Sequence, residues 1–217
     1  MQDEKARHIY VVFASTRSYM GRLIRLATHY EYNHVAIAMS KDLDTLYSFA
    51  RYNKDSALVG GFVEESALRY FYKNGQAANI RVYDIPVTEE QYTHLEDKIE
   101  YIKKNSHQYI YNTFSAMVSP FGARVRIYRA YTCVEFVAEL LAMFKIVEGL
   151  EQGNSCTIEG MEGLLKEYLV YEGSIYAAAN VHGWGADQYI KRNSMLKSCR
   201  RTIGHFGRLI RRAVRSY

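Results

Sequence analysis

Two short segments are apolar at nearly every position, and they set the strongest limit on the fold. Residues 8–14 read His-Ile-Tyr-Val-Val-Phe-Ala, and residues 33–39 read Asn-His-Val-Ala-Ile-Ala-Met. Runs of this length, rich in β-branched and aromatic residues, are typical of strands that are buried on both faces. We therefore expect both segments to be strands inside the protein.

The remaining periodic segments predict an α+β fold. Strands are expected at 46–50 and at 80–85, where Pro86 ends the second one, and Gly60-Gly61 precedes a short apolar run. Two capping boxes, Thr-Glu-Glu-Gln at 88–91 and Thr-Cys-Val-Glu at 132–135, mark the starts of helices. The expected helices span residues 18–30, 88–105, 132–147 and 157–168. Residues 106–130 are expected to be irregular. Strands that follow one another closely favour antiparallel pairing.

Length and charge divide the chain into a body and a basic tail. The 217 residues are enough for one domain, which we place at residues 1–190. Residues 191–217 hold nine of the 28 Lys and Arg residues and none of the 23 Asp and Glu residues, so the body itself is mildly acidic. With no apolar run of about 18 residues and no signal peptide, we expect a cytoplasmic protein.

Cys133 occupies the first helical position after the Thr132 cap, where a thiol has a chemical advantage. The positive end of the helix dipole favours thiolate over thiol, and thiolate is the nucleophilic form. The successive spacings of the three cysteines, Cys133, Cys156 and Cys199, are 23 and 43 residues, and these spacings match no zinc pattern. We expect free thiols and neither a metal nor another cofactor. The alternative for Cys133 is a buried small apolar residue.

A catalytic cysteine needs a base, and His34 is the strongest candidate. It opens the apolar strand at 33–39, so its ring belongs at the rim of the sheet, and imidazole titrates in the range that this role requires. His182 is a second candidate. A third polar group usually fixes the imidazole; we expect Ser48 in that place, with Glu64 as the alternative.

These residues, in this order, resemble a known superfamily. A strand-opening His in Asn-His-Val-Ala-Ile-Ala-Met precedes, by about a hundred residues, the helix start Tyr-Thr-Cys-Val-Glu-Phe-Val. The pattern is similar to the circularly permuted branch of the NlpC-type papain-like superfamily, which includes YiiX-like hydrolases and lecithin retinol acyltransferase-like enzymes. The resemblance covers about residues 8–170.

The resemblance implies a papain-like core in which the cysteine helix packs on an antiparallel sheet. By position it makes Cys133 the nucleophile, His34 the base and Ser48 the third residue of a cysteine amidase, peptidase or thioesterase-like hydrolase. Tyr111 or Tyr109 would help to hold the oxyanion. The implied substrate is a peptide, an amide or a lipid acyl group. The alternatives are a lipid acyltransferase and a non-catalytic module that keeps the fold and binds a ligand.

The tail has the pattern of an amphipathic helix. Over residues 196–214 its apolar residues gather on one arc, and its Lys and Arg residues gather on the opposite arc. This pattern is typical of a helix that lies on an anionic membrane, which would place the protein at the inner membrane face. The alternative is a terminal helix docked on the acidic body. Nucleic acid is disfavoured as a partner, because no compact basic fold accompanies the tail.

Overall fold

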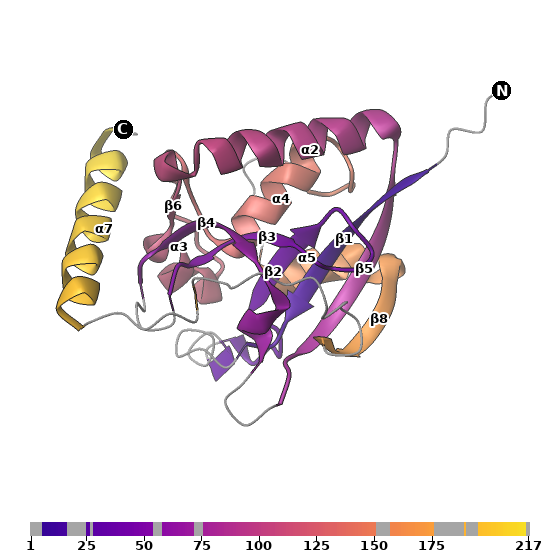
Figure 1. Ribbon diagram of the computed structural model, residues 1–217, viewed down its shortest axis with the longest axis horizontal. Coiled ribbons are helices and arrows are strands. Elements are labelled where there is room, and N and C mark those ends of the chain that lie inside the picture. The colour runs from indigo at the N-terminus through magenta and orange to yellow at the C-terminus, as the bar shows by residue number, and fades with distance from the viewer. Residues whose placement is uncertain are drawn as a thin grey trace.

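The computed structural model describes residues 6–16, 25–26, 28–53, 58–71, 76–150, 157–175, 189 and 195–215. In this part of the chain six strands form one antiparallel sheet in the order β4-β3-β2-β1-β5-β8 (Figure 1). The expected α+β class with antiparallel pairing is confirmed. The strands are β1 Arg7–Ala14, β2 His34–Ala38, β3 Leu46–Arg51, β4 Gly60–Glu65, β5 Asn79–Val87 and β8 Leu169–Ser174.

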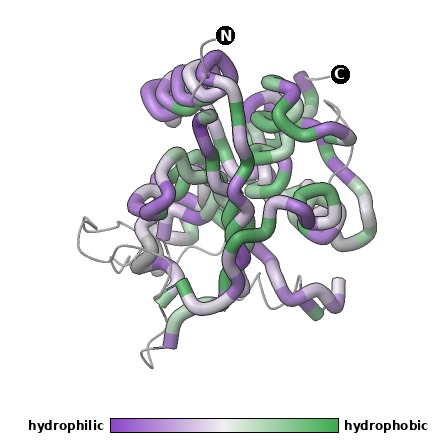
Figure 2. Tube along the Cα trace, turned by 90° about the vertical axis from the view of Figure 1, so that its right-hand side faces the viewer, coloured by the Kyte–Doolittle hydropathy of each residue, from purple (hydrophilic) through white to green (hydrophobic). Residues whose placement is uncertain are grey.

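Strands β1 and β2 lie in the middle of the sheet, as their apolar sequences predict. Residues 35–38 of β2 are buried, and so are residues 9–14 of β1. Alternate side chains enter two different clusters, one on each face of the sheet. Figure 2 shows the apolar stretches of chain running through the interior of the molecule. His34, the first residue of β2, is only partly buried and therefore lies at the border of the core.

Helices α2 (Glu89–Lys104) and α4 (Cys133–Met143) lie on the same side of the sheet (Figure 1). Both begin where their capping boxes predict, with Thr88 and Thr132 as N-caps. The ring of Phe136 packs against Phe49 and Phe62 of β3 and β4, with centroids 5.0 and 5.9 Å apart. These contacts place the start of α4 over the strands.

The region 106–130 is more regular than its sequence indicates. It contains strand β6 (Ile110–Tyr111) and helix α3 (Thr113–Val118), and it leads into strand β7 (Ala130–Tyr131). Strands β6 and β7 pair in parallel. Each pairs over only two residues, too short a span to leave a periodic signal in the sequence.

Three expected boundaries were wrong. Strand β5 runs past Pro86, which is tolerated because β8 pairs only with residues 79–83 of β5, so the strand has a free edge there. Helix α4 stops at Met143, because Lys145 adopts a left-handed backbone with φ of 50°. The helix expected at 157–168 is α5 (Ile158–Leu165) followed by a 3-10 turn. Most of the helix expected at 18–30 lies outside the described residues.

The basic tail forms helix α7 (Met195–Arg215), which lies at the end of the molecule opposite β8 (Figure 1). Leu209 is fully buried in a small cluster with Ile110, Ile127 and Ala130. The alternative of a docked terminal helix is therefore confirmed for one face of α7. None of the described helices is long and apolar enough to cross a bilayer.

Candidate active site

Cys133 lies at the first position of α4, next to a cavity. Its thiol is free and only 6 % of the residue is exposed. The first four N–H groups of a helix have no acceptor within the helix, so this end of α4 is electropositive and suited to an anion. The side chain therefore has the environment that the capping box predicts for it.

The start of α4 is fixed by the hydrogen bonds of Glu135, the third residue of the helix. Glu135 accepts a hydrogen bond from the backbone N–H of Thr132 at 2.7 Å, and the Thr132 hydroxyl accepts one from the N–H of Glu135 at 3.3 Å. The same buried carboxylate accepts from Ser115 of α3 at 2.5 Å and from Arg124 at 3.0 Å. These bonds tie α3 and the loop after it to the residue that precedes Cys133.

His34 lies between Cys133 and a buried carboxylate. Its Nε2 is 3.1 and 3.0 Å from the two carboxylate oxygens of Glu65, at the end of β4. The Cys133 side chain is close enough to the imidazole to raise its pKa. Since Glu65 occupies Nε2, Nδ1 is the nitrogen left for the thiol. The arrangement is a chain of three groups, Cys133, His34 and Glu65.

The Glu65 carboxylate is held in place from two other sides. It is 2 % exposed, it accepts a hydrogen bond from the hydroxyl of Tyr70, and Arg69 lies 3.8 Å away as an ion-pair partner. Burial alone would raise the pKa of this carboxyl, but His34, Arg69 and Tyr70 together outweigh burial and lower it. Glu65 is therefore ionised at neutral pH.

Glu65 and Cys133 determine the charge of His34. Burial disfavours the imidazolium, but the negative charge of Glu65 and the interaction with Cys133 outweigh burial and raise the pKa of His34 to about 10. An imidazolium between a carboxylate and a thiol favours the thiolate form of that thiol. The site is thus arranged to hold a positively charged imidazolium between Glu65 and Cys133.

The expectation for Ser48 was wrong. Ser48 is fully buried in β3, and its hydroxyl donates to the backbone carbonyl of Val35 at 2.8 Å rather than to the His34 ring. Glu64, the alternative, lies on the opposite face of β4 from Glu65 and pairs with Lys103 at 2.7 Å. The sequence signal for Glu65 was the Glu-Glu pair itself, because in a strand one of two adjacent residues must face inward.

The structure separates the two tyrosine candidates. Tyr111 lines the same cavity as Cys133, and burial together with Cys133 raises its pKa, so its hydroxyl is a proton donor at neutral pH. Parallel pairing with β7 brings it there, since Tyr111 is level with Tyr131, two residues before Cys133. Tyr109 instead packs in the core, with its ring 6.3 Å from Phe49 and 6.4 Å from Tyr131.

The cavity beside Cys133 has a volume of about 200 Å³. Its walls come from four places: the segment before β2, β6 with α3, the start of α4, and the start of α5. The sequence analysis missed Tyr30 and Tyr32, which line it from the first of these segments. Among the described residues, the buried hydroxyl of Tyr30 has no hydrogen-bond partner, and it is therefore available to a bound molecule.

His182 and Cys156 lie outside the described residues. Within the described parts of the chain, no three His, Cys, Asp or Glu side chains are grouped closely enough to hold a metal ion. Comparisons of this chain with protein-family models, with curated proteins and with solved structures found no match.

Proposed function

We propose that this protein is a cysteine hydrolase that cleaves an amide or a thioester through an acyl-enzyme on Cys133. The observation that carries the proposal is the position of His34, which is hydrogen-bonded to the Glu65 carboxylate and is close enough to the thiol of a helix-start cysteine for that thiol to raise its pKa. Nucleophile, base and orienting group in such a chain are the recurring arrangement of covalent acyl transfer.

In the first half of the reaction the Cys133 thiolate attacks the acyl carbon. Negative charge passes to the carbonyl oxygen, where the backbone N–H of Cys133 and the hydroxyl of Tyr111 are suited to stabilise it. The bond to the leaving amine or thiol then breaks, and the His34 imidazolium gives its proton to that group. The acyl group remains on Cys133 as a thioester.

In the second half water replaces the leaving group. Neutral His34 takes a proton from the water as its oxygen attacks the thioester carbon, and the carboxylic acid product leaves. Thiolate and imidazolium are thereby restored. Glu65 stays ionised throughout, because its part is to hold the ring and to stabilise the positive charge on it.

The order of these residues also supports the permuted papain-like assignment as part of the proposal. The histidine strand comes first, and α4 packs against β2 and β3 of an antiparallel sheet. The cavity suits a short acyl group or a small side chain, with Tyr30 and Tyr32 offering aromatic contact. Transfer of the acyl group to an acceptor other than water would use the same intermediate. A serine in the third position would orient the imidazole only weakly, and this favoured the alternative of a non-catalytic module. The Glu65 carboxylate takes that position instead, so the support for a non-catalytic module is weaker.

An activated ester tests the proposal directly. The protein is incubated with p-nitrophenyl acetate, and acetylated peptides are mapped by mass spectrometry. We expect rapid acetylation of Cys133, none in Cys133→Ala, and slower labelling of Cys199, an exposed thiol on α7. Decay of the adduct in water alone indicates a hydrolase, and decay only with an added amine or alcohol indicates a transferase. Equal release of p-nitrophenol by the two proteins would contradict the proposal.

Removing the Tyr111 hydroxyl gives a more specific prediction. Tyr111→Phe is expected to slow acetylation of Cys133 about 10- to 100-fold, because one oxyanion donor is lost while the ring still fills its place. Tyr109→Phe is the matched control, since the Tyr109 ring lies in the core away from the cavity. The rates are measured by p-nitrophenol release. Equal effects of the two substitutions would contradict a role for Tyr111 at the carbonyl oxygen.

A further inference from the structure

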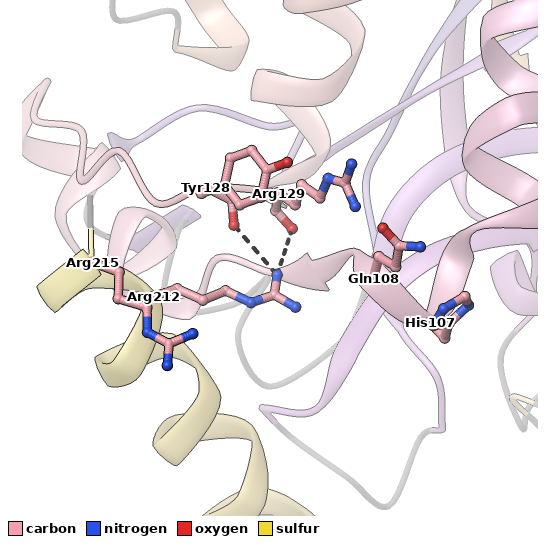
Figure 3. A pocket seen from close by; sticks show the side chains of 6 residues that line it. All are labelled: His107, Gln108, Tyr128, Arg129, Arg212 and Arg215. Atoms are coloured by element: carbon pink, nitrogen blue, oxygen red, sulfur yellow. Dashed lines mark hydrogen bonds between the residues drawn. The ribbon is translucent and has the colours of Figure 1, made fainter.

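Helix α7 is attached to the body along one of its faces. His205 and Leu209, one turn apart, are fully buried, and Nε2 of His205 donates to the backbone carbonyl of Tyr111 at 2.9 Å. Arg212 donates to the backbone carbonyls of Tyr128 and Arg129 at 3.3 and 3.2 Å, across the cavity shown in Figure 3. The docked face is therefore held by both apolar and polar contacts.

A second apolar stripe on α7 is exposed. Ile203, Ile210 and Val214 are 75, 54 and 73 % exposed. At 100° per residue they fall within a sector of about 40°, whose centre lies about 140° around the helix from His205 and Leu209 on the docked face. Exposed β-branched side chains aligned in this way mark an interaction surface. We call these three residues the α7 stripe.

Beyond the stripe, the surface of the helix is basic. At 100° per residue, Arg200 lies about 60° from the centre of the stripe, and Arg211 and Arg215 follow at about 80° and about 120°. All three are exposed, and Arg215 also lines the cavity in Figure 3. The described helix contains no acidic residue. A second copy of this chain would bring arginines against arginines, and nucleic acid would leave the stripe without an apolar partner. An anionic bilayer satisfies both halves of the surface, because acyl chains cover the stripe and headgroup phosphates meet the arginines.

Helix α3 extends this surface toward the cysteine cavity. Phe206, which lies between the docked face and the stripe, packs on Phe114 of α3 with ring centroids 5.7 Å apart. Helix α3 and the 3-10 turn that follows it, Ser119–Phe121, carry the exposed side chains of Met117 and Phe121, while Ala116 and Ser119 of the same segment line the cavity beside Cys133. One short segment thus has an apolar exposed side and a side that borders the cavity.

We propose that the α7 stripe, its flanking arginines and the exposed side chains of α3 form a binding surface for an anionic lipid bilayer. The docked face stays on the body when the protein binds, so the cavity beside Cys133 is held near the lipid surface. This inference stands apart from the proposed chemistry, since it uses none of the groups assigned to it.

Vesicle flotation tests the surface with the full-length protein. The wild type is expected to float with vesicles that contain phosphatidylserine and to stay unbound with pure phosphatidylcholine. Changing Ile203, Ile210 and Val214 together to serine should abolish flotation, because these side chains are exposed and the docked face is untouched. Val170→Ser, an exposed site on β8, is the control and should float like the wild type. Arg200→Gln, which removes the charge next to the stripe, should weaken binding about fivefold.

Three results would overturn the proposal. The first is unchanged flotation of the stripe variant, and the second is absence of flotation by the wild type at low salt. The third is a wild-type dimer that the stripe variant converts to a monomer in the absence of lipid. Cys133→Ala is measured in parallel and should float normally. A failure of the acyl chemistry then remains distinguishable from a failure of lipid binding.

Discussion

Replacing His34 with alanine is expected to slow acylation of Cys133 by about 10²- to 10⁴-fold, one of the two largest losses that the structure predicts. The substitution removes both the group that stabilises the thiolate and the acid that protonates the leaving group. The measurement is the rate of p-nitrophenol release, with the acyl adduct located by mass spectrometry. Free imidazole added to His34→Ala should restore part of the rate, because the missing ring leaves space beside the cavity.

The matched control for this substitution is His94→Ala. His94 is an exposed histidine of α2 that stacks on Phe144, with ring centroids 6.1 Å apart, and it does not line the cavity. Cys133 in the His94→Ala variant should be acylated at the wild-type rate. A folded His34→Ala variant that acylates Cys133 as fast as the wild type would remove His34 from the mechanism.

Local sequence signals were enough to predict half of the candidate site. Thr132 and Glu135 are three residues apart, so their reciprocal hydrogen bonds form without help from distant parts of the chain. The position of Cys133 on α4 followed from them. His34 was placed at a strand end because the apolar run beside it is unambiguous. Both predictions depend on interactions within a few residues.

The other half depends on contacts between distant segments. Whether Glu64 or Glu65 faces His34 depends on which alternate side chains of β4 point toward the core. This alternation is set by the pairing of β4 with β3 and not by the glycines that begin the strand. Gly60 is required there because a Cβ would lie 2.2 Å from the carbonyl oxygen of Ala50. Tyr111 is selected by the parallel pairing of β6 and β7, which spans only two residues. Neither pairing has a sequence signature.

Replacing Glu65 with glutamine should cause the other large loss. The amide keeps the shape of the side chain but removes the charge that stabilises the His34 imidazolium, and we expect acylation of Cys133 to fall about 10²- to 10⁴-fold. Breaking the buried pair should also cost about 3–5 kcal/mol in the free energy of unfolding. Glu64→Gln, on the adjacent exposed carboxylate, should change both quantities little.

The stability loss of Glu65→Gln should depend on pH in a defined direction. The folded-state pKa of His34 is raised to about 10, from an ordinary value of about 6.5. The ion pair therefore contributes its full stability below about pH 6.5 and loses it as the pH rises through about 10. On the acid side Glu65, with its lowered pKa, loses its contribution as the pH falls through that value.

Thermal unfolding of the wild type and Glu65→Gln at a series of pH values measures this dependence. The difference in melting temperature should be largest at about pH 6 and should shrink toward about pH 10. Glu64→Gln provides the baseline for general charge effects. A difference that grows with rising pH would mean that His34 is neutral in the folded protein, contrary to the ion pair described here.

The most direct test of an activated Cys133–His34 pair is the rate of iodoacetamide alkylation at Cys133 as a function of pH, in the wild type and in His34→Ala. Cys199 serves as an ordinary exposed thiol in the same molecule. The predicted result is that Cys133 is alkylated much faster than Cys199 between about pH 6 and pH 8, and that His34→Ala removes this difference. A Cys133 rate that equals the Cys199 rate across this range and does not respond to His34 would contradict an activated pair.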